Sequence, residues 1–465
     1  MSRQRLTSSD TMFLYLESRE TMMHVAGLLQ FTPPPEMPPD HLRRLVDELR
    51  RAPPVVQRPW NLKLSSPDLL VNPLQSWVED RDFDLDYHVR RSALPSPGDE
   101  RELGIIVSRL HGHQIDFHRP PWELHLIEGL EHGRFALYVK VHHALVDGYS
   151  AMRILASSLS RDPDERAQPM FFEVPPPKRA PRDDHEGLHL FDVMSAVRAQ
   201  LGASRSVASA LVKLVRERAR GRGHDKSELV SPLQAPKCLL NRRISRARRF
   251  ATYKVDTARL KAIAKAANGT LNDVILALSG ASLRRYLLEL DALPDAPLVA
   301  MVPVNVRPKD DAGGGNAIGA ILASLATDVA DAGEQLDAVI ASTRRAKEQL
   351  AGMSKAAIIQ YSALLMSPFM LQLIPGAPGR VRPAFNVVIS NVPGPDEPLY
   401  FRGARLDSSY PMSIPVHGLA LNITCNSYAG SLNFGFIGCR DTVPHLQRLA
   451  VYCNDAVAEL ERALI

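Results

Sequence analysis

The heptad His142–Gly148 and the apolar run before it constrain this chain more than any other stretch of its sequence. Residues 135–141 read Phe-Ala-Leu-Tyr-Val-Lys-Val, a run typical of a β-strand, and a helical pattern follows from Tyr149 to Ser160. The heptad His-His-Ala-Leu-Val-Asp-Gly therefore occupies the turn between a strand and a helix. Residues on such a turn can reach a cleft, and here they include two imidazoles, a carboxylate and a glycine.

The chemistry of these residues suits proton transfer. Histidine titrates near neutral pH, so a neutral imidazole can take a proton from a hydroxyl and return it within one turnover. Neighbouring residues on a strand point to opposite faces, so only one of the two histidines can face a given cleft. We assign His143 as the general base and His142 as its support. Asp147 either contacts the imidazole or anchors an arginine, and Gly148 permits a positive φ or a close backbone approach.

A structural reading of the heptad stays open beside the catalytic one. In that reading His142 and His143 are a buried, hydrogen-bonded pair, and Asp147 is the N-cap of the following helix.

The length and composition indicate a globular protein of two domains. A chain of 465 residues exceeds one ordinary core, and its 45% hydrophobic and 23% charged residues are typical of soluble proteins. The net charge of +5 is compatible with a phosphate-bearing ligand or an anionic membrane surface. No motif or aromatic-basic platform accompanies that charge, so we expect no nucleic-acid partner.

The chain divides into three parts by pattern. Residues 1–165 form an N-terminal domain that carries the heptad, residues 166–245 form a basic and partly helical linker, and residues 246–465 form a C-terminal domain. Both domains mix strands and helices without a strict βαβ repeat, which predicts an α/β fold with mixed sheets and flanking helices. The elements we expect are helices over 11–17 (started by Ser8-Ser9-Asp10), 41–51, 100–115, 271–288, 332–350 and 443–464, strands over 23–31, 249–255, 298–307, 318–327 and 385–390, an extended segment over 77–92, and a hairpin at Ala429-Gly430.

Two further features bear on location. None of the four cysteines (Cys238, Cys425, Cys439 and Cys453) forms a C-x-x-C pair, and residues 1–10 lack an apolar signal core, so we expect a cytoplasmic protein. Residues 356–374 are uncharged, but Pro368 interrupts them, so they are no transmembrane span. They either line a lipid pocket or membrane interface, or form a buried core helix.

Several motifs, taken in order, resemble the bacterial wax ester synthase/acyl-CoA:diacylglycerol acyltransferases along almost the whole chain. These motifs are residues 23–27 (Met-His-Val-Ala-Gly), 119–123 (Arg-Pro-Pro-Trp-Glu) ahead of 127–130, the heptad, 272–274 (Asn-Asp-Val), 303–307 (Pro-Val-Asn-Val-Arg) and 389–395 (Ile-Ser-Asn-Val-Pro-Gly-Pro). One departure is Pro121, where the family usually has leucine, and we expect little consequence because this is a packing position.

The resemblance implies a chloramphenicol-acetyltransferase-like fold, with two related domains and an active-site tunnel between them. It implies that His143 is the general base and that Asp147 is an architectural residue, for which we choose Arg307 as the partner. Acyl-CoA is then a substrate and no cofactor is bound, while the acceptor is diacylglycerol, a long-chain fatty alcohol, or both. The family also implies a peripheral association with the inner membrane or with lipid droplets.

The proposed reaction needs hydrogen-bond donors for the oxyanion that forms at the thioester carbonyl. Asn272, Ser390 and Asn391 are candidates, because each is polar where an apolar element ends. The alternatives are a helix start that caps itself at Asn272 and a plain turn after Asn391. Nothing resembles a nucleophile elbow or a Cys-His pair, so we expect no acyl-enzyme. The spacing of His111, His113, His118 and His125 is not that of a metal site, and we expect none.

Two other functions remain as alternatives. A condensation-type enzyme of the same superfamily would use carrier-protein thioesters and fit the same two halves and His143. A non-catalytic lipid-binding protein would carry the heptad as a remnant.

Overall fold

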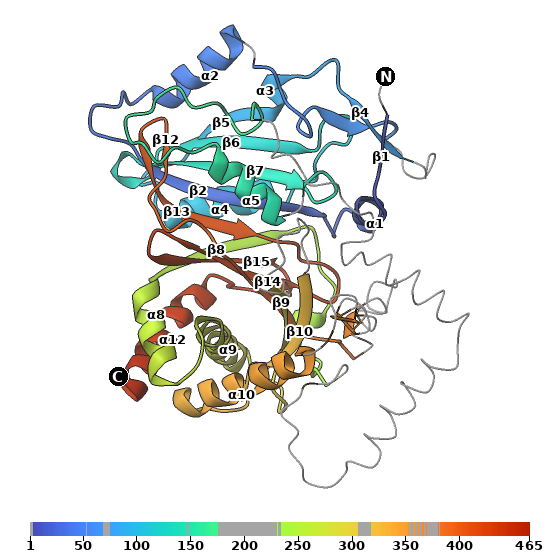
Figure 1. Ribbon diagram of the computed structural model, residues 1–465, viewed down its shortest axis with the longest axis vertical. Coiled ribbons are helices and arrows are strands. Elements are labelled where there is room, and N and C mark those ends of the chain that lie inside the picture. Colours follow the sequence, from blue (N-terminus) through green and yellow to red (C-terminus); the bar gives the residue numbers. More distant parts are fainter. Residues whose placement is uncertain are drawn as a thin grey trace.

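The computed structural model describes residues 3–52, 54–67, 75–146, 148–174, 230, 234–305, 318–351, 353, 357–358, 361–362, 365–366, 369, 380 and 382–465. Two six-stranded sheets dominate it, one in each half of the molecule, and the halves are stacked on each other (Figure 1). Both sheets mix parallel and antiparallel pairs, as the α/β prediction requires.

The N-terminal sheet has the strand order β12-β13-β2-β7-β6-β5. Its strands are β12 (Tyr400–Phe401), β13 (Ala404–Met412), β2 (His24–Thr32), β7 (Phe135–His142), β6 (Trp122–Glu128) and β5 (Val89–Ala93). β7 is buried along its whole length and is antiparallel to both neighbours, β2 and β6. Its odd-numbered residues from 135 to 141 pack into one core, whereas Ala136 and Tyr138 pack into another on the opposite face.

Helices and a small sheet complete the N-terminal half. The helices are α1 (Ser8–Leu16), α2 (His41–Arg51), α3 (Leu85–His88), α4 (Glu100–His111) and α5 (Gly148–Ser157), with a short 3-10 helix over Glu131–Gly133. The small sheet consists of β1 (Gln4–Arg5), β4 (Ser76–Glu79) and β3 (Leu62–Leu64). The core on the α2 and α5 face also takes in Trp60 and Trp122, so Trp122 of the Arg-Pro-Pro-Trp-Glu motif is a core anchor.

The C-terminal sheet has the order β10-β9-β11-β14-β15-β8. Its strands are β10 (Ile318–Ser324), β9 (Val299–Asn305), β11 (Val387–Val392), β14 (Leu421–Tyr428), β15 (Ser431–Cys439) and β8 (Arg248–Asp256). The helices α8 (Thr257–Ala266), α9 (Leu271–Glu289), α10 (Ala332–Leu350) and α12 (Arg448–Leu464) cover the face that points away from the N-terminal half (Figure 1). A 3-10 helix over Leu239–Asn241 precedes β8.

An apolar core shared by the two halves holds them together. It joins β2, α4 and β7 to Phe250 of β8, Tyr410 and Met412 of β13, and Ile437 of β15. Two hydrogen bonds between a side chain and the backbone reinforce it: the Phe250 N–H donates to the Ser108 hydroxyl at 2.9 Å, and the Arg248 guanidinium donates to the carbonyl of Glu20.

One segment of the C-terminal half forms strands of the N-terminal sheet. Residues 400–412, far along the C-terminal half, form β12 and β13 in the N-terminal sheet, where Met412 pairs with Ala26 and Arg405 with Thr32. The division of the chain at residues 166 and 246 therefore follows the sequence but not the sheets. Residues 175–229, most of the linker that we predicted, lie outside the described residues.

The structure corrects two expectations about local elements. Ser8 and Ser9 lie inside α1, and the N-cap is Thr7, which forms a capping box with Asp10. The segment 77–92 is not extended throughout, because Asp84 caps the short helix α3 between β4 and β5. The helices predicted over 41–51 and 332–350 are confirmed residue for residue.

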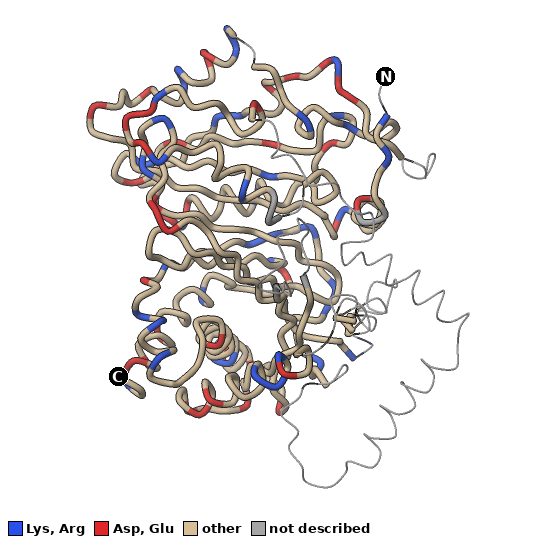
Figure 2. The backbone as a smooth tube through the Cα atoms, viewed as in Figure 1, with Lys and Arg blue, Asp and Glu red and all other residues tan. Residues whose placement is uncertain are grey.

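The charged residues lie mostly at the periphery of the molecule. Figure 2 shows most charged residues on loops and outer helices rather than on the central strands. Within the described parts of the chain, none of the helices has the length and hydrophobicity that crossing a bilayer requires. Most of the uncharged segment 356–374 lies outside the described residues, but Leu365, Met366 and Phe369 are buried and pack with Phe385.

Candidate active site

Backbone hydrogen bonds fix the turn that carries the two histidines. His142 ends β7 opposite His24 of β2, and its N–H donates to the carbonyl of Pro121 at 2.9 Å. The N–H of His143 donates to the carbonyl of Met23 at 2.8 Å, and α5 begins at Gly148. The heptad therefore forms the strand-to-helix turn that the sequence predicts, held from both sides by the chain just before β2 and β6.

The side chain of His143 lies where the two halves meet. Its imidazole is half-buried and stacks on Phe13 of α1, with ring centroids 4.0 Å apart and an interplanar angle of 24°. Phe13 in turn packs against an apolar cluster that includes Met23, Val299 of β9 and Leu322 of β10. Through Phe13, the ring is thus one contact away from a cluster to which both halves contribute, which is the position that a group acting between the halves requires.

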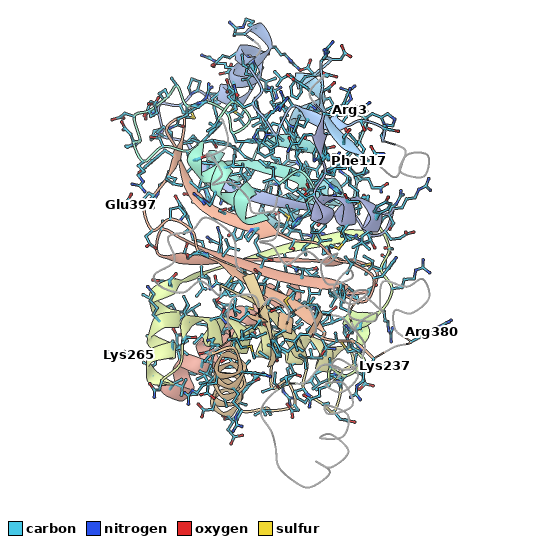
Figure 3. All side chains as sticks on the ribbon, turned by 45° about the vertical axis from the view of Figure 1, so that its right-hand side comes forward. Arg3, Phe117, Lys237, Lys265, Arg380 and Glu397 are labelled. Carbon is cyan, nitrogen blue, oxygen red and sulfur yellow. The ribbon has the colours of Figure 1, made fainter. Side chains whose placement is uncertain are left out.

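His142 is buried in a separate environment from its neighbour. Its Nδ1 accepts a hydrogen bond from the Ala144 N–H at 3.2 Å, and its Nε2 lies 3.6 Å from Oε2 of Glu17. Phe117, labelled in Figure 3, meets the His142 ring edge-on at 5.0 Å. These contacts fix the turn through Ala144. The side chain of His143 takes no part in them and stacks on Phe13 instead.

Glu17 connects α1 to this turn, and sequence reasoning did not identify it. One carboxylate oxygen accepts from the Met23 N–H at 2.5 Å, and the other accepts from Nε2 of Gln114 at 3.0 Å. Because the Met23 carbonyl accepts from His143, Glu17 lies one residue's backbone away from the base. Its signal in the sequence is only a carboxylate six residues before Met23, and Phe13 carries no signal of its own.

A buried polar layer lies beneath the two histidines. His24 Nε2 donates to the His111 carbonyl at 2.9 Å, and His111 Nδ1 lies 2.9 Å from the hydroxyl of Tyr138. Burial lowers the pKa of both His24 and His111 well below the ordinary value, so both rings stay neutral. They therefore serve as a neutral support for the end of β7.

An ion pair completes this layer. Lys140 is fully buried, and its Nζ lies 3.0 Å from the Glu123 carboxylate and donates to the carbonyls of Leu110 and His113 at 3.1 Å. Burial lowers the pKa of Lys140. Hydrogen bonds from His125 and Lys140, with the charges of Lys140 and Arg90, outweigh the burial of Glu123 and hold its pKa at about 2. The pair attaches the end of α4 to β7, two residues before His142.

The histidines that seemed metal-rich in the sequence are scattered. His111 and His125 are buried with the protein partners named above, whereas His118 is exposed beside Asp116. Among the residues that the structure describes, no three His, Cys, Asp or Glu side chains are grouped so that they could hold a metal ion.

Two of the predicted site residues fall outside the description. Asp147 and Arg307 both lie among the residues that are not described, so their pairing stays a prediction. Of Gly148 the structure gives only its place as the first residue of α5.

The three oxyanion candidates lie on different surfaces. Ser390 pairs with Thr424 and shares a face with Val388, and Val388 and Phe13 each pack against the same apolar cluster. Asn391 is the next residue, so it points to the other face, where its Oδ1 lies 3.6 Å from Sγ of Cys425. Ser390 therefore lies on the face of β11 that carries Val388, and the roles of Ser390 and Asn391 stay predictions.

Asn272 belongs to the helix layer on the far side of the C-terminal sheet. It is the second residue of α9, whose first turn is closed by a capping box between Thr270 and Asp273. Asp273 also accepts from the Thr343 hydroxyl of α10 at 2.6 Å. Thr270 and Asp273 thus cap and pack the start of this helix, and the role of Asn272 as an oxyanion donor stays a prediction.

Sequence comparisons identify a family over nearly the whole chain. The profile of the wax ester synthase/diacylglycerol acyltransferase catalytic domain matches residues 6–275, and that of the C-terminal domain of the same family matches residues 314–461. A putative diacylglycerol O-acyltransferase of Mycobacterium tuberculosis is 53% identical and covers 99% of this chain and 97% of its own. The O-acyltransferase WSD of Acinetobacter baylyi is 41% identical over 97% of this chain and 96% of its own.

Solved structures agree with the sequence comparisons. The wax ester synthase/diacylglycerol acyltransferase of Marinobacter aquaeolei VT8 is 39% identical, covers 99% of this chain and all of its own, and superimposes with a TM-score of 0.78. The first condensation domain of the CDA synthetase, 17% identical, covers this whole chain and 97% of its own with a TM-score of 0.53. That likeness concerns the fold alone and confirms the predicted fold class.

Proposed function

Because this chain belongs to the wax ester synthase/diacylglycerol acyltransferase family, it is an O-acyltransferase, and we propose that it moves a long-chain acyl group from acyl-CoA to a lipid hydroxyl. The acceptor in this proposal is diacylglycerol, a long-chain fatty alcohol, or both. The single observation that carries the proposal is the position of His143, a half-buried imidazole on a backbone-anchored turn where the two halves meet.

The proposed step uses His143 as both base and acid. The acceptor oxygen bonds to the thioester carbonyl carbon while the imidazole takes the hydroxyl proton, which gives a tetrahedral intermediate and an imidazolium. The carbon–sulfur bond then breaks, and the imidazolium returns its proton to the leaving sulfur. The products are an ester and free CoA, and no acyl-enzyme forms.

Neighbouring residues take positioning and stabilising parts in this proposal. The stack with Phe13 and the hydrogen bond from the His143 N–H to the Met23 carbonyl orient the imidazole. Glu17 and His142 hold the backbone on either side of it. We assign the Ser390 hydroxyl as a donor to the oxyanion, and we keep Asp147 with Arg307 as an architectural pair.

The location of the enzyme follows from its substrates. Diacylglycerols and long-chain alcohols reside in lipid phases, so an enzyme that acylates them works at a membrane or lipid-droplet surface. The net charge of +5 favours peripheral attraction to anionic lipid headgroups. We therefore propose a cytoplasmic enzyme that associates peripherally with the inner membrane or with lipid droplets.

One experiment tests the acyl transfer and the choice of acceptor together. Labelled palmitoyl-CoA is supplied with equal amounts of hexadecanol and diolein, and the lipid products are separated. We expect labelled wax ester, triacylglycerol or both, and a parallel incubation with palmitoyl acyl carrier protein should give far less product. A preference for the carrier-protein donor would support a condensation-type enzyme, and lipid binding without product would support a non-catalytic protein.

The His143→Gln variant tests the assigned base. Glutamine keeps a polar side chain of similar size but cannot carry the proton, so we expect kcat to fall by about 10²- to 10⁴-fold. The matched variant His142→Gln should lose less activity, because His142 acts through the backbone of the turn. A folded His143→Gln protein with the wild-type rate would contradict the assignment.

A further inference from the structure

A basic surface lies outside the residues that the proposed reaction uses. Residues 229–255 contain seven Lys and Arg and no Asp or Glu, so this stretch of the chain is entirely basic. Three of its arginines are exposed, and so are one arginine in the turn before β2 and one in the last turn of α4. We call these five residues the arginine patch: Arg19, Arg109, Arg242, Arg243 and Arg246.

A buried arginine joins two parts of the patch. The guanidinium of Arg248, which is only 4% exposed, donates to the carbonyl of Glu20, next to Arg19. It also donates to the carbonyl of Ser245, next to Arg246. The turn that carries Arg19 and the segment that carries Arg246 are therefore neighbours in space.

The end of α4 packs against the same two parts. A Cβ at Gly112 would lie 3.4 Å from the carbonyl oxygen of Arg246, so the two backbones pack closely there. Gln114 donates to the carbonyl of Ser18 at 2.9 Å. Arg109 lies in the last turn of α4, three residues before Gly112. Three separate segments thus present their arginines on one surface with a fixed backbone.

The positive charge of the patch is not neutralised within the described part of the protein. None of the five guanidiniums forms an ion pair or a hydrogen bond with another described residue. The acid beside the segment, Asp441, accepts from the Ser245 hydroxyl at 2.6 Å and lies 3.4 Å from its own cation, Arg440. Only Glu20 then balances the five charges, so the surface stays positive.

An apolar side chain on this surface indicates what kind of anion it meets. Ile105 lies one turn before Arg109 on the same face of α4 and is 40% exposed. The interface of an anionic bilayer offers phosphates for guanidiniums and an apolar layer for such a side chain. A soluble phosphate or a nucleic acid would contact the arginines but would leave Ile105 in water.

The patch lies at the edge of the molecule that carries the histidine turn. Glu20, whose carbonyl Arg248 holds, is three residues before Met23. The Met23 carbonyl accepts from the N–H of His143 at 2.8 Å. A surface that binds the patch therefore lies beside the segment that anchors the proposed base.

We propose that the arginine patch docks this protein on an anionic phospholipid surface, with the guanidiniums on headgroup phosphates and Ile105 in the interfacial layer. The inference rests on the proposed function, which locates the enzyme at a lipid phase, and it adds the face that makes the contact. Docking by this face turns the edge with His143 toward the lipid that supplies the acceptor.

Vesicle binding tests the docking face without relying on catalysis. The full-length protein is sedimented with vesicles of equal parts phosphatidylglycerol and phosphatidylcholine. Each arginine near an anionic surface contributes about fivefold to binding, so Arg242→Gln/Arg246→Gln should bind about 25-fold more weakly than the wild type. Ile105→Ser should bind about threefold more weakly, because it loses apolar area. Vesicles of phosphatidylcholine alone should retain little of the wild type.

The matched control removes two charges elsewhere. Lys261 and Lys265 lie one turn apart on α8, and both are exposed. In Figure 3, Lys265 lies on the opposite side of the molecule from Lys237, which belongs to the basic stretch. Vesicle binding of Lys261→Gln/Lys265→Gln should stay within about twofold of the wild type.

A second patch variant and a kinetic comparison complete the test. If Arg242→Gln/Arg246→Gln does not fold, Arg109→Gln/Arg243→Gln should show the same loss of binding. With hexadecanol in an uncharged detergent, the patch variants should keep the wild-type kcat and the wild-type KM for palmitoyl-CoA. With diolein in the anionic vesicles, their rate should fall in parallel with binding.

Three results would overturn the inference. Wild-type vesicle binding by the patch variants would exclude this face, and an equal loss in the α8 control would show that net charge alone decides. A raised KM for palmitoyl-CoA in the uncharged detergent would assign the arginines to the phosphates of CoA. All three leave the proposed function intact, which fails only if the wild type transfers no acyl group from palmitoyl-CoA in either medium.

Discussion

The imidazole of His143 stacks on the phenyl ring of Phe13, with the ring centroids 4.0 Å apart. This contact joins α1, near the start of the chain, to the turn after β7. Because the ring of His143 has Phe13 against one face, the phenyl group limits the orientations that the imidazole can take.

Replacing Phe13 by leucine should therefore impair catalysis more than stability. Leucine fills much of the space but provides no flat surface, and a misplaced catalytic group of this kind costs up to about 10²-fold in rate. We expect kcat to fall about 10- to 100-fold in Phe13→Leu, whereas Phe13→Tyr, which keeps the ring, should stay near the wild type. Steady-state kinetics with palmitoyl-CoA measure both. A wild-type kcat in Phe13→Leu would show that the stack does not orient the base.

Glu17 offers a test of the backbone support beneath His143. Glu17→Ala leaves the Met23 N–H without its acceptor, which should cost about 1–3 kcal/mol of unfolding free energy and lower kcat. Glu17→Gln keeps a carbonyl oxygen for that N–H, so it should recover most of both quantities. Urea unfolding and kinetics on the two variants check this. Equal losses in both would mean that the charge of Glu17, rather than its hydrogen bond, matters.

The buried ion pair of Lys140 and Glu123 should be important for stability. Lys140→Met leaves the carboxylate buried without its closest cation, which typically costs about 3–5 kcal/mol. The exposed pair of Arg43 and Asp40 provides the control, and Arg43→Met should cost less than about 1 kcal/mol. Denaturant unfolding of both variants measures the difference. A loss for Lys140→Met as small as that of the control would contradict the interpretation.

Buried histidines make the stability depend on pH in a definite direction. Burial lowers the pKa of His24 and His111, and that of His88 to about 4, whereas an unfolded histidine titrates near about 6.5. Between these values the unfolded chain binds more protons than the folded one, so stability rises with pH. The contribution of these histidines to the unfolding free energy should be fully present above about pH 6.5, and it should decrease as the pH falls toward about 4.

The slope of that decrease is the quantity to measure. Each such histidine contributes up to about 1.4 kcal/mol per pH unit, and Glu123, with its pKa held at about 2, adds a further loss below about pH 4.5. Urea midpoints between pH 7 and pH 4.5 give the curve. His88→Gln should have a shallower slope than the wild type, and a flat profile in the wild type would contradict the burial argument.

Local patterns predict the elements around the site well. The strand before His142, the helix after Gly148 and the helix over 332–350 follow from apolar periodicity and from capping residues, which act over a few residues. The same patterns place His142 and His143 on opposite faces. They do so because strand alternation is a property of the backbone alone.

Such local patterns do not predict contacts between distant segments. Phe13 and Glu17 reach the heptad from α1, and nothing in the sequence near either residue indicates a partner more than 120 residues away. The assignment of Asn272 as an oxyanion donor stays a prediction, since a polar residue at a helix start has the same local pattern on either side of a sheet. Strand pairing places Ser390 opposite Thr424 and Asn391 opposite Cys425, a register that the sequence alone does not show.

The pairing of β13 with β2 determines how this enzyme can be recombined with its relatives. A fragment that ends before residue 400 would leave β2 as an edge strand, with its side opposite β7 unpaired and open to intermolecular association. A chimaera joined in the linker would combine β13 from one parent with β2 from the other. The residue pairs that Arg405 to Met412 form with β2 would then come from different proteins and fit poorly. Productive exchange between homologues should therefore transplant residues 400–412 together with the N-terminal half, as an insertion into the recipient rather than as a single crossover.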